Sequence, residues 1–258
     1  MNKPVTILFI ISVGLSCAQN TNDTFNKITN DSQWQLKFKD NATGNWNKKW
    51  ILDGRKANVK NTTAGMVFSA GPIPKDDSCH AVLWTKAAFN GAIKIEYDYT
   101  RIDTLKQFVN ILYIQATGMP PRHADIMQWK EERTIPAMHQ YFDKMKCLHI
   151  SYAAFGNNED EYIRARHYPR PENSVFSTTT EIAPSYVDSG LFIPGTTYKI
   201  TVIKKDNMLY MMVRHDQTKK LFHWKLLPKQ NVVFGRIGLR HMYTRVSRYS
   251  NFKIYTFK

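Results

Sequence analysis

The sequence predicts an all-β protein, a β-jelly roll made of two antiparallel sheets (a sandwich) with a short helical or irregular insertion. Strand-like runs of alternating or β-branched residues, such as AIKIEYDYT and TYKITVIKK, recur along most of the 258 residues. Short proline and glycine turn signals separate these runs, and no internal repeat or Gly/Ser-rich linker divides the chain. The insertion covers residues 125–145, where Pro136 must break any helix. We therefore expect a single domain.

The N-terminus has the pattern of an export signal. A lysine precedes an apolar run that is too short to span a bilayer, and Ser16-Cys17 ends this run as a bacterial lipoprotein site would. We expect residues 1–17 to be a signal peptide of the lipoprotein type, 18–31 a flexible tether without the apolar residues for a core, and 32–258 the β-jelly-roll catalytic domain. The expected location is outside the cytoplasm, as a periplasmic or outer-membrane lipoprotein whose lipid anchor makes the membrane contact.

The formal net charge of +15 favours polyanionic partners. Nucleic acid, anionic lipid and acidic polysaccharide all have the required charge. For an exported bacterial protein the acidic polysaccharide is the most accessible of the three, so we expect an acidic oligosaccharide and no nucleic acid. A basic protein without any polyanionic partner is the alternative, and the oligomeric state is left open.

The cysteines allow two interpretations. If Cys17 carries a lipid, Cys79 and Cys147 remain as a pair in an oxidising compartment. A disulfide between them would bring their Cα atoms within roughly 7 Å of each other, and with them His80 and His149. Two buried free thiols are the other possibility.

Cationic and aromatic side chains gather on two adjacent strand-like runs. In CLHIS, strand alternation turns His149 away from its apolar neighbours. In YIRARHY, two tyrosines and two arginines share one face: Tyr162, Arg164, Arg166 and Tyr168. This pattern indicates a cleft on a sheet surface that grips an acidic sugar, although the arginines could instead pair with the acidic turn residues 159–161.

Several stretches resemble a known family: His80 with VLW, FVNILYIQATG, DIMQW with Arg133, HISYAAF, YIRARHY and GRIGLRHM. They are similar to domain-of-unknown-function family 1961, in the concanavalin A-like lectin/glucanase superfamily. The resemblance implies a concanavalin-like jelly roll whose concave sheet holds a sugar. It also implies similarity to oligosaccharide dehydratases from ulvan and rhamnogalacturonan degradation loci, which remove water from a terminal uronic acid.

Elimination at a uronic acid needs groups of the kind found here. The C5 proton becomes acidic when the neighbouring carboxylate is neutralised, a His or Tyr then abstracts this proton, and a donor protonates the group that leaves C4. A sugar as the leaving group makes the enzyme a lyase, whereas hydroxide makes it a dehydratase. The catalytic candidates are His149, Tyr152, Tyr168, His241 and Tyr243. The substrate-binding candidates are His80, Gln115, Trp129, Arg133, Tyr162, Arg164, Arg166, Arg240 and Arg245.

Two other functions are compatible with these patterns. A non-catalytic module could bind the same acidic glycans with the same basic and aromatic residues. A glycoside hydrolase could use Glu96 and Asp98, which share a strand face, but Lys94 on that face equally fits a solvated sheet surface. No phosphate loop, nucleophile elbow or zinc motif is present, so we expect no metal ligands and no cofactor, apart from a structural calcium ion that would leave no sequence signature.

Overall fold

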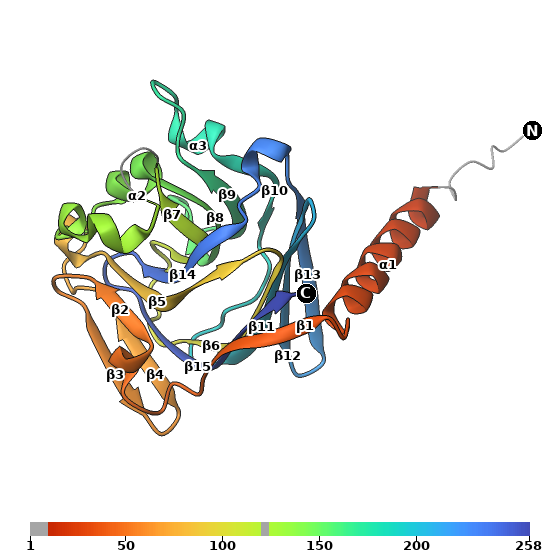
Figure 1. Cartoon of the computed structure of the whole chain (residues 1–258). Helices are drawn as coiled ribbons and strands as arrows, with labels where there is room; N and C mark the ends of the chain where they lie inside the picture. The colour runs from red at the N-terminus through yellow and green to blue at the C-terminus, as the bar shows by residue number, and fades with distance from the viewer. Residues whose placement is uncertain (1–9, 120–123) are drawn as a thin grey trace, which may run out of the picture.

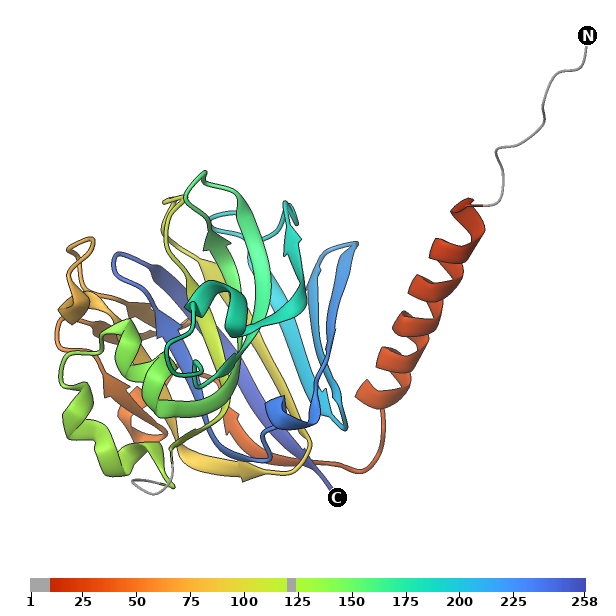
Figure 2. The same cartoon turned by 90° about the horizontal axis from the view of Figure 1, so that it is seen from above.

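The computed structural model describes residues 10–119 and 124–258 of the chain, with side chains from residue 19 onward. Two antiparallel sheets pack face to face, and a few short helices lie at their edges (Figures 1 and 2). This architecture confirms the predicted all-β sandwich.

The back sheet has eight strands in the order β13-β12-β11-β6-β15-β4-β3, and β1 pairs with the second half of the long strand β15. Its strands are β1 (Trp34–Asp40), β3 (Asn58–Thr62), β4 (Gly65–Ser69), β6 (Ile93–Arg101), β11 (Thr197–Lys205), β12 (Met208–His215), β13 (Thr218–Lys225) and β15 (Val246–Phe257).

The front sheet has seven strands in the order β10-β9-β8-β7-β14-β5-β2. Its strands are β2 (Trp50–Asp53), β5 (Ala81–Asn90), β7 (Asn110–Gly118), β8 (Met145–Phe155), β9 (Glu161–Tyr168), β10 (Glu181–Val187) and β14 (Phe234–His241). The helical segments are α1 (Ile10–Thr29), η1 (Trp46–Lys48), η2 (Asp77–Cys79), η3 (Ile126–Arg133), α2 (Met138–Lys144), α3 (Phe176–Thr179) and η4 (Pro228–Gln230).

Strand alternation builds the core between the sheets. On β8, Leu148 and Ile150 are fully buried in the main hydrophobic cluster, together with Ile95 of the back sheet. On β14, Ile237 and Leu239 join the same cluster. The intervening residues of these front-sheet strands face outward, and this outer face carries the candidate site.

The predicted insertion covers part of the outer face of the front sheet (Figure 1). As the sequence indicated, Pro136 lies in a break, here between η3 and α2. A buried carboxylate fastens the insertion to the sheet: Asp53 Oδ2 accepts hydrogen bonds from Arg133 Nε at 2.7 Å and from Trp84 Nε1 at 2.8 Å. Arg133 Nη1 in turn donates to the Ile126 carbonyl at 2.8 Å.

The expected flexible tether, residues 18–31, is helical as far as Thr29 in the structure. Phe25 of α1 is fully buried against the outer face of the back sheet, where its ring centroid lies 5.8 Å from that of Tyr210. Trp34 Nε1 also donates to the Ile28 carbonyl at 2.7 Å. Residues 19–29 thus form a docked helix in the structure, held by Phe25 together with Ile28 and Trp34. The signal peptide and the lipid anchor stay predictions.

Within the described part of the chain, no helix is long and apolar enough to cross a membrane. Cys79 and Cys147 are both buried as free thiols in the described structure, so the open question about a disulfide is answered in favour of two separate thiols. Cys147 lies in the hydrophobic cluster beneath the insertion, where burial raises the pKa of its thiol well above the ordinary value.

Candidate functional site

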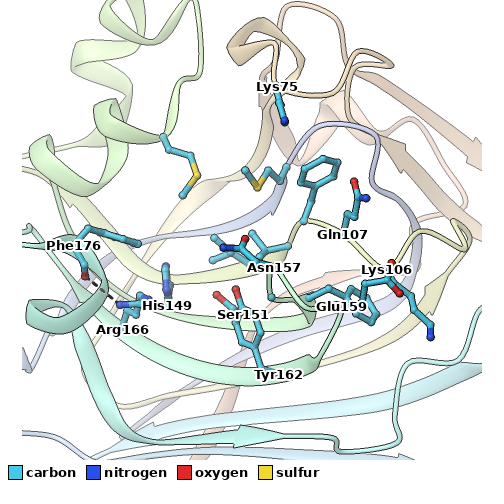
Figure 3. Close-up of a pocket in the computed structure, with 17 residues that line it drawn as sticks. Lys75, Lys106, Gln107, His149, Ser151, Asn157, Glu159, Tyr162, Arg166 and Phe176 are labelled. Carbon is cyan, nitrogen blue, oxygen red and sulfur yellow. Dashed lines mark hydrogen bonds between the residues drawn. The ribbon is translucent and has the colours of Figure 1, made fainter.

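A cleft of about 540 Å³ opens on the outer face of the front sheet (Figure 3). Its floor comes from β7, β8 and β9, which contribute Ile111, His149, Ser151, Tyr162 and Arg166. The walls come from α3, from the start of α2, from the loop before β7 and from the loop after β8. The cleft therefore lies beside the part of the sheet that the insertion covers.

Strand register aligns two side chains of the floor with a tyrosine beside it. Tyr113 on β7 pairs with His149 on β8, which pairs with Arg166 on β9. Because directly opposed residues of neighbouring strands point to the same face, these side chains form one row on the outer surface. Figure 3 shows His149 and Arg166 together at one end of the cleft.

His149 is the most unusual residue of the row. Its side chain is 2 % exposed, and neither ring nitrogen has a hydrogen-bond partner among the described residues. Burial, followed by the charges of Arg166 and Arg240, lowers the pKa of His149 well below its ordinary value. The imidazole is therefore neutral near pH 7, with a lone pair that can accept a proton.

Two tyrosines contact the His149 ring. The ring centroid of Tyr168 lies 4.9 Å away in an edge-to-face arrangement, and that of Tyr113 lies 5.9 Å away. Burial raises the pKa of Tyr113 to about 12 and that of Tyr168 well above its ordinary value. Both hydroxyls therefore keep their protons at neutral pH and are potential donors.

Arg166 fixes the wall of the cleft at α3. Its Nη1 donates to the Phe176 carbonyl at 3.2 Å, to the Ser177 carbonyl at 2.9 Å and to Thr180 Oγ1 at 2.8 Å. The guanidinium also stacks on the Phe176 ring at 4.7 Å. Both N–H groups of Nη1 are thus used inside the protein.

Arg164 lies one row further along and covers Tyr162, with 4.5 Å between the guanidinium carbon and the ring centroid. The acidic partner that it shares with Arg166 is Glu181 on β10, at 3.3 Å and 3.7 Å respectively. The alternative considered from the sequence, pairing with the acidic residues of the turn 159–161, named the wrong partners. The correct partner comes from strand pairing, because Glu181 lies directly opposite Arg166.

Loops complete the rim with residues that the sequence reasoning did not identify. Lys75 and Lys106 are exposed there and add positive charge, whereas Glu159 adds a carboxylate. Lys75, Phe108 and Glu159 have φ values of 62°, 66° and 64°. No sequence signal announces non-glycine residues in this left-handed region, so their place at the rim could not be predicted.

Two catalytic candidates lie in the core instead of the cleft. His241 Nε2 is 2.8 Å from the Tyr249 hydroxyl, and its ring stacks on Phe68 of the back sheet at 4.3 Å. The Tyr152 hydroxyl is 3.4 Å from the same Tyr249 hydroxyl. Strand alternation accounts for both positions. Tyr152 lies on the same face of β8 as the core residue Ile150, and His241 lies on the same face of β14 as Ile237 and Leu239.

Four substrate-binding candidates have structural roles. Arg245 holds the rim loop through the carbonyls of Gln107 and Ala153, both at 2.9 Å. Gln115 donates to the Gly91 carbonyl at 3.0 Å. The expected stacking platform, Trp129, is 3 % exposed and lies 4.1 Å below the guanidinium of Arg133, which itself bonds Asp53.

The remaining candidates adjoin the cleft. The ring centroid of His80 lies 4.4 Å from that of Tyr243 in a tilted arrangement, and Tyr243 contacts the rim residue Phe108 at 4.7 Å. Burial lowers the pKa of His80 to about 2. Arg240 is fully buried next to the cleft floor, with its guanidinium carbon 4.4 Å from the ring centroid of Tyr141.

The carboxylate pair weighed for a hydrolase lies on the other side of the molecule. Glu96 and Asp98 face outward from the back sheet, where they accept hydrogen bonds from Tyr255 and Asn251 at 3.2 Å and 2.7 Å. They line a separate hollow that shares no residue with the cleft. Among the described residues, no group of three His, Cys, Asp or Glu side chains is arranged to hold a metal ion.

Sequence comparison connects this architecture with a family. The domain of unknown function DUF1961 matches residues 38–254. The chain belongs to this family. No curated protein is similar in sequence to this DUF1961 chain.

Solved structures with the fold of this DUF1961 chain include lectins. A Bacillus subtilis protein of unknown function with a galectin-like fold has 16 % identity and a TM-score of 0.68, over 87 % of this chain and 100 % of that one. Lectin II from Ulex europaeus has 8 % identity and a TM-score of 0.56, over 85 % and 97 %. The VIP36 exoplasmic/lumenal domain, in its Ca²⁺/Man3GlcNAc-bound form, has 12 % identity and a TM-score of 0.53, over 81 % and 84 %. The shared feature is the concanavalin- and galectin-like sandwich.

Proposed function

We propose that this DUF1961 chain is a carbohydrate-active enzyme that binds an acidic oligosaccharide in the cleft and acts on it by β-elimination at a uronic acid. The observation that supports this proposal is the buried, neutral His149, whose ring nitrogens have no partner in the described structure although it lines an open cleft. A buried polar group without a partner is costly, and a substrate would supply the missing contact.

In the proposed reaction, His149 accepts the C5 proton of the uronic acid and the C4–O bond breaks as the C4=C5 double bond forms. Tyr168, which keeps its proton at neutral pH, is the proposed donor to the departing oxygen. A cation of the site neutralises the carboxylate and so makes the C5 proton more acidic. When the departing group is the C4 hydroxyl, the second product is water.

More specifically, we propose a dehydratase that forms a 4,5-unsaturated uronic acid at the non-reducing end of oligosaccharides such as those from ulvan. The support for this specific reaction is the resemblance of the sequence to its family. Lyase cleavage uses the same proton acceptor and donor and differs in the departing group alone.

A second candidate function is non-catalytic binding of acidic glycans. The fold favours it, because structural neighbours include lectin II from Ulex europaeus, which has also been solved in complex with galactose. Both functions use the same cleft, and they differ in whether His149 transfers a proton.

The test is ultraviolet absorbance of the conjugated double bond during incubation with ulvan and rhamnogalacturonan oligosaccharides, followed by mass spectrometry of the product. We expect absorbance to rise with the wild type and not with His149→Ala. His223→Ala is the matched control, since His223 lies on β13 of the back sheet, far from the cleft residues in the strand order. Loss of water in the product would identify a dehydratase. Binding without any absorbance change would overturn the enzyme proposal and favour the binding module.

We also propose that the chain is exported and lipidated at Cys17. Labelled palmitate should enter the wild type in a bacterial host and not enter Cys17→Ala. Equal labelling of the two proteins would contradict this.

A further inference from the structure

Arg240 on β14 is a buried cation without a counter-ion. Its side chain is fully buried, and its Nη2 donates to the Pro136 carbonyl at 3.3 Å. In residues 10–119 and 124–258, Nε and Nη1 have no hydrogen-bond partner, and no carboxylate lies within ion-pair distance. Arg133, a buried residue of the insertion itself, is paired with Asp53, so this part of the protein does provide counter-ions elsewhere.

Acidic side chains near Arg240 are bonded to its neighbours and not to Arg240 itself: Asp53 Oδ2 accepts from the Tyr141 hydroxyl at 3.4 Å, and Asp77 Oδ1 lies 3.4 Å from His80 Nε2. The positive charge of Arg240 lowers the pKa of His149 and His80. It also lowers the pKa of Tyr113 and Tyr168 and so offsets part of the rise that burial causes. All four groups are therefore near Arg240 and neutral at pH 7. A buried guanidinium among neutral groups is unfavourable unless an anion joins it.

Arg240 adjoins the cleft through two methionines. Arg240 pairs with Ile111, which lies in the cleft floor, and Met242 continues the same face of the chain after β14. On the other side, Met138 begins α2 two residues after Pro136, which accepts the hydrogen bond from Arg240. Both methionines line the cleft. Arg240 itself does not line the cleft, so a ligand group would reach it only when these two side chains, which are unbranched and change rotamer readily, move aside.

We propose that Arg240 is the counter-ion for the anionic substituent of the ligand, a carboxylate or a sulfate, and that it selects acidic over neutral sugars. Arg166 is then a positioning residue, because its Nη1 is already occupied by three acceptors of the α3 wall. The choice of an acidic sugar as the ligand rests on the proposed function. The role of Arg240 in binding this ligand does not require that elimination takes place.

A purely structural role for Arg240 leads to different expectations. In that case the hydrogen bond to Pro136 and the contact with Tyr141 would hold the insertion, so removing the charge would destabilise the protein and leave ligand selectivity unchanged. If Arg240 instead awaits an anion, its replacement by an apolar side chain of similar length removes an uncompensated charge.

The experiment compares the wild type with Arg240→Met and with Arg248→Met, a matched loss of one positive charge on the back sheet. The ligands are an ulvan oligosaccharide with a terminal uronic acid, its carboxyl-reduced derivative and inorganic sulfate. The readouts are the melting temperature and the dissociation constant. We expect the acidic sugar and sulfate, but not the reduced sugar, to stabilise the wild type and Arg248→Met. In Arg240→Met the melting temperature without ligand should not fall, and the acidic sugar should bind roughly 10- to 100-fold more weakly.

Equal binding of the acidic and reduced sugars by the wild type would overturn the inference, and so would an unchanged response of Arg240→Met to the acidic sugar and sulfate. Should Arg240→Met fail to fold, nitrogen-labelled arginine in the wild type decides the question. Comparison with the spectrum of Arg240→Lys identifies the Nε–H resonance of Arg240 in the wild type. This resonance should shift with the acidic sugar and not with the reduced one, and no shift would overturn the inference. Acid-selective binding through Arg240 without elimination would leave this inference standing and overturn the enzyme proposal alone.

Discussion

His149 and Tyr168 meet edge to face across β8 and β9, with 4.9 Å between their ring centroids. Burial acts on the two side chains in opposite directions, since it lowers the pKa of the histidine and raises that of the tyrosine. A proton acceptor and a proton donor are thereby kept in their uncharged forms next to each other. Environments that push neighbouring pKa values apart are typical of acid–base sites.

Acidification should destabilise the protein through its buried histidines. The pKa values of His80 and His241 are lowered to about 2 and about 3, and that of His149 is also far below normal. In the unfolded chain these groups take up protons below about pH 6.5, so the free energy of unfolding falls as pH drops, by up to ~1.4 kcal/mol per pH unit for each histidine. Urea unfolding at pH 7 and pH 5 measures this. Burial also lowers the pKa of His167, so four histidines contribute to this effect. His241→Phe removes one of them and should reduce the pH slope, and an unchanged slope would contradict the assignment.

Asp53→Asn should loosen the insertion. The substitution leaves Arg133 as a buried charge without its carboxylate partner, and we expect a loss of about 3–5 kcal/mol in the free energy of unfolding. The control is Asp206→Asn, which breaks the solvent-exposed pair with Lys205 and should have little effect. Similar stability losses in the two variants, measured by urea unfolding, would rule out a special role for the buried pair.

Gly238→Ala should displace Trp84. The Trp84 ring lies over Gly238, and a Cβ there would overlap it. Trp84 also stacks with Tyr113 at 5.4 Å, so the row that contains His149 should shift as well. Overpacking of this kind typically costs about 1–3 kcal/mol, which urea unfolding would detect together with a changed near-ultraviolet spectrum of the aromatic residues. Gly44→Ala, at an open position, is the control, and equal effects would argue against close packing at Gly238.

Phe25→Ala should release α1 without unfolding the sandwich. The Phe25 ring is the fully buried contact between this helix and the back sheet, and large-to-small changes at such sites cost about 3–5 kcal/mol. Hydrogen exchange of residues 19–29 should therefore become fast, whereas the sheets keep their protection. Thr24→Ala, at an exposed neighbouring position, should leave exchange unchanged. Continued protection of the helix in Phe25→Ala would show that other contacts hold it.

Alternation in the sequence predicted the sandwich and the outward direction of His149, Arg164 and Arg166, because a strand with one buried face has a strict period of two. The same rule, applied to Tyr152 and His241, assigns both to the core. Both residues were named as catalytic candidates because of their polar groups. Strand alternation places them on the same face as their buried neighbours and so predicts their core position.

Other parts of the site had no readable signal. Lys75, Lys106 and Glu159 reach the rim through loop conformations that local sequence does not determine. The pairing of Arg166 with Glu181 depends on β10 lying next to β9. The missing counter-ion of Arg240 is a property of the assembled neighbourhood, since it requires knowing which carboxylates are close to it.

The docked helix and the cleft lie on opposite outer faces of the sandwich, since Phe25 packs on β12 and the cleft opens over β7, β8 and β9. The helix therefore leaves the cleft face uncovered, so a ligand can occupy the cleft while α1 stays docked on the back sheet.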